Sequence, residues 1–290
     1  MKRKKKFALI GCAGFIAKKH VSIIKKINGE LILALDKHDN VGYLDTYFPE
    51  CIFLKRENIF FKKIKEMKLD YVVICSPNYL HYKHINLSLK SNSNVICEKP
   101  TVLNITDLKK IQKLEAKTNK RCYSLFQLRY NTNLINLKNK IKKLGKKNKP
   151  LKIEISYNTP RGNWYQSSWK SNKKLSGGLI YNIGVHFFDM ISWFFGKSIS
   201  NIIHINDKDI VKGETTFNKA IVKWKLSTEF KKKINNSSFD RYIKFNSKTI
   251  NFTKNFNDLH FKAYKNIIIG KGIKTMDILT TFRNLEKLKK

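Results

Sequence analysis

The 290-residue chain is long enough to bury a substantial core and to form two domains. A hydrophobic content of 42% with 12% aromatic residues excludes a disordered chain, and no apolar stretch is long enough to span a bilayer. The formal net charge of +38 is typical of nucleic-acid binding, but only seven of the 59 basic residues are Arg, the residue preferred for reading bases and phosphates. Because the lysines are spread along the whole chain, together with abundant Asn, Ile and Phe, we interpret the charge as the bias of an A/T-rich genome and expect no specific nucleic-acid partner.

The first 125 or so residues alternate short apolar runs with helical patterns. Strands are expected at Phe7–Ile10, Leu31–Asp36, Cys51–Leu54, Tyr71–Cys75, Asn94–Cys97 and Cys122–Leu125. Helices are expected at Ile16–Ile27, Ile59–Met67, Leu80–Leu89 and Thr106–Thr118. Such alternation predicts crossover units and a parallel sheet covered by helices, in an α/β domain over residues 1–125.

Residues 145–150 mark a turn into a different pattern. Longer, alternating strands are expected at Lys152–Thr159, Ile199–Ile205, Phe217–Lys225, Arg241–Phe245 and Thr249–Phe252. A helix over Gly178–Phe195 interrupts them, and helices near Leu259–Ile269 and Met276–Lys287 close the chain. This pattern predicts an α+β domain over residues 126–290 with an open, largely antiparallel sheet. An alternative prediction is that the last helices of the chain pack back on the first domain.

The amino terminus imitates a signal peptide, because the basic run over residues 1–6 precedes an apolar segment. Only five apolar or small residues stand between that run and Cys12, which is short for a signal core. Cleavage there would also delete the first expected strand, so we expect a mature, cytoplasmic protein without membrane insertion. The five cysteines form no CxxC pair, which indicates reduced thiols and no metal site.

A glycine turn follows the first expected strand and opens a helix. Gly11 permits the tight turn, and the helix amino terminus offers free N–H groups and a positive dipole end to a pyrophosphate. The sequence departs from GxGxxG, since Ala13 and Ala17 stand at the second and third glycine positions. The residues expected at this dinucleotide phosphate are Gly11, Gly14, Phe15 and Ile16.

Asp36 ends the second expected strand, 25 residues after Gly11. An acid there accepts hydrogen bonds from both ribose hydroxyls and repels a 2′-phosphate, which favours NAD over NADP. A helix cap or turn residue is the alternative for Asp36, and the neighbouring Lys37 could compensate a 2′-phosphate.

Two further strand ends carry polar motifs. Ser76, Pro77 and Asn78 stand at a strand-to-helix turn, where the polar side chains can cap the helix or bond a ribose. His81 follows in the first helical turn and is expected to be structural or to line the cofactor before it is catalytic. Lys99, between Glu98 and Pro100, is aimed from the end of a buried strand, although a solvated lysine at a loop start is the alternative.

A polar motif also lies in the second half. Asn182, His186 and Asp189 recur at spacings of four and three, which predicts one face of one helix. Buried polar groups need partners, and histidine is the natural base for a hydroxyl proton near neutral pH. A core histidine held by Asp189 is the alternative.

Together, the glycine turn, the Ser-Pro-Asn-x-x-His, Glu-Lys-Pro and Gly-Gly…Asn-x-Gly-x-His-x-x-Asp motifs resemble the glucose–fructose oxidoreductase/inositol dehydrogenase family over nearly the whole chain. The resemblance implies a Rossmann domain with bound NAD and a second domain for substrate binding and oligomerisation. It also implies that Lys99 orients and polarises a reacting hydroxyl, that His186 accepts its proton, and that Gln127, expected at the end of the sixth strand, lies beside the nicotinamide. Glu98 is expected among the cofactor-binding residues, and which of Lys99 and His186 is the formal base stays open.

Several stretches resemble the members of this family that oxidise C3 of UDP-N-acetyl-glucosaminuronate for surface polysaccharide synthesis. The residues expected to bind this substrate are Arg161, Trp164, Tyr165, Trp169, Lys170, Asn182 and His186. For the aromatic residues, a core or interface role is the alternative. The resemblance further implies that 2-oxoglutarate re-oxidises the retained cofactor and that the enzyme is a homotetramer. A free sugar or polyol as substrate, and a basic nucleic-acid-binding protein on a Rossmann scaffold, are the competing hypotheses.

Overall fold

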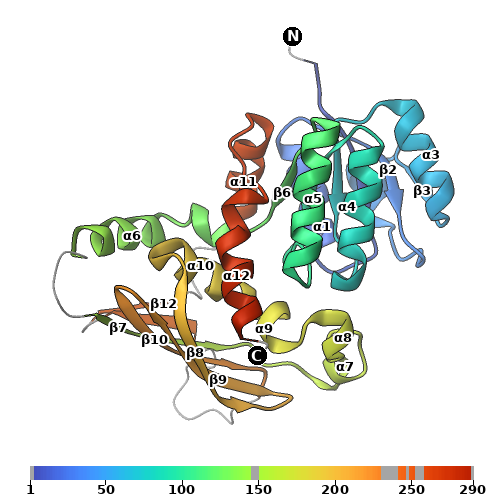
Figure 1. The fold of residues 1–290 in the computed structure, drawn as a ribbon. Coiled ribbons are helices and arrows are strands. Elements are labelled where there is room, and N and C mark those ends of the chain that lie inside the picture. The colour runs from blue at the N-terminus through green and yellow to red at the C-terminus, as the bar shows by residue number, and fades with distance from the viewer. Residues whose placement is uncertain (1–2, 145–149, 230–240, 246–247, 252–257, 289–290) are drawn as a thin grey trace. The chain divides into compact units, whose positions relative to one another are not determined.

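The computed structural model describes residues 3–144, 150–229, 241–245, 248–251 and 258–288. The chain divides into two compact units, each with its own sheet (Figure 1). The first unit comprises Met1–Val102, Thr106–Leu125 and His260–Asp277, and the second comprises Leu103–Ile105, Phe126–Leu259 and Ile278–Lys290.

A fully parallel, six-stranded sheet forms the first unit. Its strands are β1 (Lys6–Ile10), β2 (Glu30–Leu35), β3 (Ile52–Leu54), β4 (Tyr71–Ile74), β5 (Asn94–Cys97) and β6 (Cys122–Ser124). The order β3-β2-β1-β4-β5-β6 confirms the predicted parallel α/β sheet of the Rossmann type. Because the order reverses between β1 and β4, the carboxyl ends of these two strands form the switch point where such sheets bind ligands.

Helices complete this unit. They are α1 (Ala17–Lys26), α2 (Tyr43–Tyr47), α3 (Glu57–Met67), the 3-10 turn η1 (Asn78–Leu80), α4 (His81–Lys90), α5 (Ile105–Thr118) and α11 (Leu259–Ile268). The chain leaves β1 in one direction across the sheet and β4 in the other, so right-handed crossovers place α1 and α4 on opposite faces. Every residue of β4 is accordingly buried, as expected for a strand covered on both sides.

The second unit also contains a six-stranded sheet. Its strands are β7 (Leu151–Asn158), β8 (Ser198–Asn206), β9 (Ile210–Phe217), β10 (Ala220–Ser227), β11 (Arg241–Phe245) and β12 (Lys248–Asn251). Their order is β12-β11-β7-β10-β9-β8, and among these pairs β7 and β10 alone are parallel, so the predicted largely antiparallel sheet is confirmed. Burial alternates along β9, because one face of the sheet packs on the core.

The remaining elements pack in the second unit or lead into it. They are η2 (Gln127–Tyr130), α6 (Thr132–Leu144), α7 (Asn163–Gln166), α8 (Lys173–Ser176), α9 (Gly178–Asn182), α10 (Val185–Phe195), η3 (Met276–Ile278) and α12 (Leu279–Lys287). The α6 helix, the short α2 helix and β9 are absent from the sequence-based expectation. The buried positions Leu134, Leu137 and Ile141 of α6 follow the helical spacing that would have revealed it.

Two predicted elements are wrong. The expected strand Phe217–Lys225 contains a hairpin turn, because Phe217 ends β9 and pairs with Ala220, the first residue of β10. The expected helix Gly178–Phe195 breaks after α9 and restarts at Val185. Of the expected turn at 145–150, only Pro150 lies within the described residues, and residue 252 of the last expected strand lies outside them.

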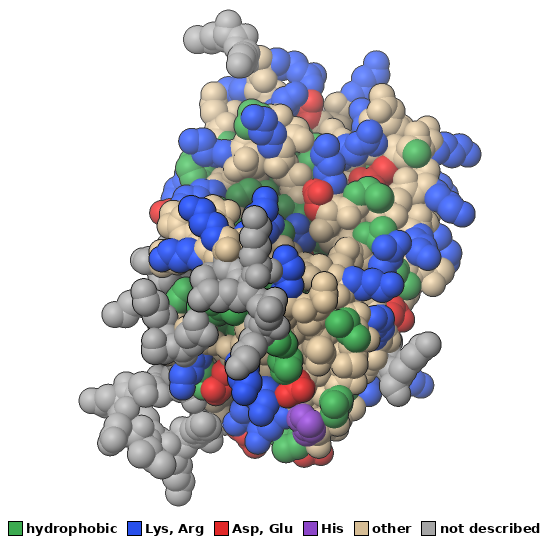
Figure 2. Space-filling view, turned by 60° about the vertical axis from the view of Figure 1, so that its left-hand side comes forward, with side chains coloured by type: hydrophobic (Ala, Val, Ile, Leu, Met, Phe, Trp, Pro, Cys, Tyr) green, Lys and Arg blue, Asp and Glu red, His purple; other side chains and the backbone are tan. Residues whose placement is uncertain are grey.

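The basic side chains show no single focus on the face presented in Figure 2, where Lys and Arg are scattered among acidic, apolar and uncharged residues. Among the described residues, no helix is both long and apolar enough to cross a membrane.

Packing around Gly213 provides a test of the second core. A Cβ at this position of β9 would lie 2.4 Å from the carbonyl oxygen of Ile202 and 2.5 Å from the Trp224 ring. We expect Gly213→Ala to lower the free energy of unfolding by about 1–3 kcal/mol, because the backbone and the indole must shift. Urea denaturation followed by circular dichroism measures the change. The matched control is Gly42→Ala, whose Cβ meets no atom within 4 Å, and equal stability of the two variants would contradict this packing.

Candidate functional site

The glycine turn after β1 lies against the backbone that follows β4. Gly11 has φ of +82°, and a Cβ there would lie 2.6 Å from both the carbonyl carbon of Cys75 and the nitrogen of Ser76. Only glycine fits this approach without displacing backbone. No side chain caps α1 at Ile16, so the helix amino terminus keeps N–H groups and a positive dipole end for an anion. The neighbouring Phe15 ring is 96% exposed.

Asp36 closes the same turn from the end of β2. Its Oδ2 accepts a hydrogen bond from the Ala13 N–H at 2.9 Å, and its Oδ1 accepts from the His38 N–H at 3.1 Å. Each carboxylate oxygen can accept a further bond, so these contacts leave acceptor capacity for ribose hydroxyls. The glycine cradle, the uncapped helix terminus and this acid fit a dinucleotide.

His81 links the loops that follow β4 and β5. Its Nδ1 lies 2.7 Å from the carbonyl oxygen of Pro100, and its Nε2 lies 2.7 Å from that of Ser76. Burial lowers the pKa of His81, whereas both carbonyls favour ring N–H groups. The Ser76 hydroxyl forms a hydrogen bond with Nδ1 of His84 at 2.8 Å. Pro77 precedes the turn η1, whose first residue, Asn78, is buried. The His81 ring therefore fixes two loops at the switch point.

The end of β5 directs two charged residues differently. Glu98 is buried, whereas Lys99 is half-buried and begins the loop with a cis peptide to Pro100. The Lys99 N–H donates to Oε2 of Glu98 at 3.2 Å. The backbone of Lys99 is thus anchored by the side chain that precedes it.

His186 lies in the second unit, buried in the first turn of α10, with the Phe126 ring edge-on at 6.3 Å between centroids. Asn182 ends α9 and donates to the Tyr165 hydroxyl at 2.9 Å. The prediction that both belong to one helix is wrong, because α9 ends at Asn182 and α10 begins at Val185. At this break, a Cβ on Gly184 would lie only 2.5 Å from the Leu226 side chain.

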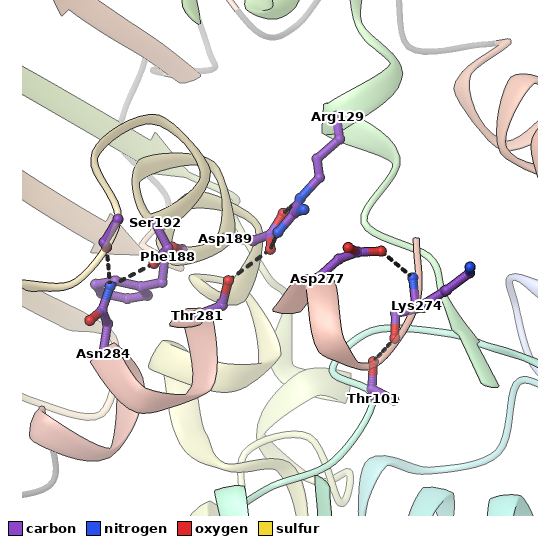
Figure 3. A network of polar contacts seen from close by, with 11 residues as sticks. Thr101, Arg129, Phe188, Asp189, Ser192, Lys274, Asp277, Thr281 and Asn284 are labelled. Carbon is purple, nitrogen blue, oxygen red and sulfur yellow. Dashed lines mark hydrogen bonds and ion pairs between the residues drawn. The ribbon is translucent and has the colours of Figure 1, made fainter. Parts of the chain in front are cut away.

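Asp189 forms a buried ion pair that the sequence did not indicate. The Arg129 Nε donates to its Oδ2 at 2.9 Å and Nη2 donates to its Oδ1 at 2.7 Å, while the Thr281 hydroxyl donates to Oδ1 at 2.9 Å (Figure 3). Nearby, Asn284 donates to the Ser192 hydroxyl at 2.9 Å. Asp189 therefore joins η2, α10 and α12 within the second unit.

Arg161 and Lys170 are cations in partly apolar surroundings of this unit. The Lys170 Nζ lies 4.9 Å from the Trp164 ring centroid and 5.7 Å from that of Trp169. Burial lowers the pKa of both cations, and the charge of Arg161 lowers that of Lys170 further. Within the described part of the chain, no carboxylate lies within 4.0 Å of either group. Half-buried cations without an acid are suited to an anionic ligand.

Gln127 begins η2 rather than ending the sixth strand as expected, since β6 stops at Ser124. Its side-chain oxygen is buried and has no hydrogen-bond partner among the described residues. A buried acceptor of this kind is costly unless a ligand or water bonds to it.

Comparison with known proteins places these features in a family. Residues 5–126 match the oxidoreductase family with an NAD-binding Rossmann fold, and residues 138–223 match the C-terminal alpha/beta domain of the same oxidoreductase family.

The chain is also similar to solved structures. A WlbA (WbpB) dehydrogenase from Thermus thermophilus, in complex with NAD and UDP-GlcNAcA, is 32% identical with a TM-score of 0.92, over 99% of this chain and 95% of that one. Its structure with NAD and alpha-ketoglutarate gives 33% identity and a TM-score of 0.91, over 98% and 94%.

Curated relatives are more distant. The putative oxidoreductase YteT of Bacillus subtilis is 28% identical over 52% of this chain and 36% of its own length. Myo-inositol 2-dehydrogenase of Thermotoga maritima is 24% identical over 48% of this chain and 40% of its own length. The chain thus spans less than half the length of these relatives.

The glycine cradle can be tested directly. We expect Gly11→Ala to weaken NAD binding about tenfold or more, because the added methyl displaces the turn from the Cys75–Ser76 backbone. Isothermal titration with NAD measures the affinity. The control is Gly42→Ala in the same unit, whose Cβ meets no atom within 4 Å. An equal loss of affinity in the two variants would contradict the role of the close approach at Gly11.

The Arg129–Asp189 pair predicts a large stability effect. Asp189→Asn keeps the side-chain shape but leaves a guanidinium only 11% exposed without its carboxylate. We expect a loss of about 3–5 kcal/mol in the free energy of unfolding. Thr281→Val, which removes one hydrogen bond to the same oxygen, should cost about 1 kcal/mol. Urea denaturation distinguishes the two, and a loss near zero in Asp189→Asn would refute the role of the pair.

Proposed function

The chain belongs to the oxidoreductase family with an NAD-binding Rossmann fold and a C-terminal alpha/beta domain, and from this premise we propose that it oxidises the C3 hydroxyl of UDP-N-acetyl-glucosaminuronate to the 3-keto sugar. The observation that carries the proposal is the similarity, over 99% of the chain, to a dehydrogenase solved with NAD and UDP-GlcNAcA. The half-buried cations of the second unit support an anionic substrate.

In the proposed reaction, the C3–H bond of the sugar breaks, and NAD bound in the first unit would supply the two-electron acceptor for the hydride. The hydroxyl loses its proton, and the C3–O bond becomes a carbonyl. Lys99 orients and polarises the hydroxyl, and His186 accepts the proton. The two side chains share this acid–base work, and Gln127 contacts the nicotinamide.

The substrate carries about three negative charges, two on the diphosphate and one on the uronate. Arg161 and Lys170 bind these anionic groups. Trp164 and Trp169, which flank the Lys170 ammonium, cover the sugar or stack on uracil. Asn182 and Tyr165, already bonded to each other, complete the sugar side of the site. In the first unit, the pyrophosphate lies at Gly11, Gly14, Phe15 and Ile16, the ribose at Asp36, Ser76 and Asn78, and Pro77, His81 and Glu98 line the cofactor.

The proposal extends to the biological setting. The cofactor stays bound and 2-oxoglutarate re-oxidises it, in line with the alpha-ketoglutarate in the Thermus complex. The enzyme acts as a homotetramer in surface polysaccharide synthesis, and the edge strand β8, which exposes Ile199 and Ile202, belongs to its subunit contacts. A cytoplasmic location agrees with five cysteines that are all free thiols.

A free polyol is the second candidate substrate, because of the similarity to myo-inositol 2-dehydrogenase. It would not require Arg161 and Lys170 as paired cations, since a polyol carries no charge. The two candidates therefore differ in which residues they need.

The experiment is to add UDP-N-acetyl-glucosaminuronate to the purified protein and follow the near-ultraviolet absorbance of reduced nicotinamide. We expect a stoichiometric rise that disappears when 2-oxoglutarate is added. Lys99→Ala and His186→Ala should each lower kcat about 10²-fold or more while NAD binding persists. The control is Lys90→Ala, an exposed lysine of α4, which should keep full activity.

Three outcomes separate the hypotheses. Full turnover in Lys99→Ala or His186→Ala contradicts the assigned chemistry. Activity on myo-inositol, with none on the uridine conjugate, selects the polyol reaction. A rise that continues only with added NAD keeps the substrate but rejects retention of the cofactor.

A further inference from the structure

A cluster of buried polar side chains surrounds Glu98, the residue that directly follows β5. Its other members are His20, His260 and Tyr264. Oε1 of Glu98 lies 3.0 Å from Nε2 of His20 and 3.2 Å from Nε2 of His260. His20 comes from α1 and His260 from α11, and their exposed fractions are 0% and 4%. Residues separated by as many as 240 positions thus converge on one carboxylate oxygen.

The donors and acceptors of this cluster match one another except at the buried Nδ1 of His260, which has no hydrogen-bond partner among the described residues. Because a carboxylate only accepts hydrogen bonds, each Nε2 carries the proton in these contacts. Nδ1 of His20 then accepts from the Tyr264 hydroxyl at 2.7 Å. Burial lowers the pKa of His20, which keeps its ring neutral. Burial raises the pKa of Glu98, but the hydrogen bonds from both histidines outweigh this effect and hold the pKa well below its usual range.

The second oxygen of Glu98 connects the cluster to the candidate active site. Oε2 accepts the backbone N–H of Lys99 at 3.2 Å. Rotation of the Glu98 carboxylate would break this bond, and the two histidines prevent that rotation by occupying Oε1. The chain from Tyr264 through His20 and Glu98 therefore ends on the backbone of Lys99.

We propose that His20, His260 and Tyr264 are positioning residues, which keep the Glu98 carboxylate fixed so that it anchors the Lys99 backbone and aims the Lys99 side chain at the substrate hydroxyl. The inference rests on the proposed role of Lys99 as the residue that polarises this hydroxyl. This positioning role explains why the polar side chains of the cluster are buried, although apolar residues in their place would lower the stability of the fold less.

A metal ion is not needed to explain this geometry. The ligand-type atoms of His20, Glu98 and His260 lie within 4.8 Å of one another, as in a metal site. The two N···O distances are ordinary hydrogen-bond lengths, and the tautomers that these bonds require leave Nε2 protonated and unable to ligate. Metal analysis of the purified protein nevertheless belongs to the test.

Besides His20 and His260, the titratable groups around Glu98 belong to five described residues. They are Cys75, Cys97, His81, Tyr264 and Lys99. Burial raises the pKa of both thiols and of the Tyr264 phenol well above their usual values, and it lowers the pKa of His81. Because Glu98 is the group that loses a hydrogen bond when His260 is replaced, a change in acid sensitivity of that variant is expected to arise from Glu98.

The test compares His260→Met with His260→Gln. Met fills a similar volume without a donor, whereas the Gln amide supplies an N–H near the position of Nε2. We expect kcat of His260→Met to fall about tenfold or more with KM for the UDP-sugar changed less than about threefold, and Gln to restore most of the loss. With one donor removed, burial raises the pKa of Glu98. The carboxylate is then protonated as the pH falls, so the acid limb of kcat moves to higher pH by about one unit or more.

Two results would overturn the inference. One is a His260→Met enzyme with wild-type kcat and pH profile while Lys99→Ala is inactive, which leaves the proposed function standing. The other is one zinc ion per chain in the wild-type protein with activity lost to a chelator. If His260→Met does not fold, Tyr264→Phe replaces it, because it removes only the hydroxyl on Nδ1 of His20. Wild-type kcat and pH profile in that variant would likewise reject the cluster as a positioning device.

Discussion

The approach of the β1 turn to the backbone after β4 is the constraint on which the first unit depends. The reversal of strand order leaves these two strand ends as neighbours without a crossover between them. Since Gly11 has no Cβ, its backbone lies directly against Cys75 and Ser76, and α1 can begin at the rim of the sheet. The ends of β2 and β5 then flank this point with Asp36 and Lys99. The absence of a Cβ at Gly11 thus allows the motifs that follow β1, β2, β4 and β5 to lie at one edge of the sheet.

The two units treat their buried acids in opposite ways. Glu98 accepts hydrogen bonds from two imidazole N–H groups and a backbone N–H, and no arginine or lysine forms an ion pair with it among the described residues. Asp189 is neutralised by the bidentate Arg129. The second unit accordingly leaves its uncancelled charges on the cations Arg161 and Lys170. An anionic residue in the cofactor domain suits an oxidised, cationic nicotinamide, and cations in the other domain suit a diphosphate and a uronate.

The sequence predicted well those features that depend on neighbouring residues in the chain. The strand ends of the first unit were recognisable because apolar runs stop at Gly, Pro or an acid, as at Gly11 and Pro100, and those residues act on their own backbone. The same local patterns failed where tertiary contacts decide. The break before α10 coincides with the packing of Gly184 on Leu226, and no periodicity between 178 and 195 reports that contact.

Convergence of distant residues was the part least accessible to sequence. In the sequence, His20 and His260 are single histidines within helical patterns, and their spacing is not typical of a site. They meet at Glu98 because α11 packs in the first unit. Arg129 and Asp189 stand 60 positions apart, and neither neighbourhood signals the other. Side-chain pairs of this kind depend on how helices pack on a sheet, which a pattern of apolar residues constrains only to a face.

The net charge of +38 then has a limited role. Exposed lysines act through a field that is screened over about 8 Å at physiological salt, so they would raise the encounter rate of the proposed anionic substrate without selecting it. Selection requires cations that have already lost part of their hydration and cannot move away. In our proposal Arg161 and Lys170 meet that condition, because burial penalises both charges and the charge of Arg161 penalises that of Lys170 further. Attraction thus arises from the composition of the whole surface, whereas recognition depends on a few residues that the fold of the second unit keeps partly dry.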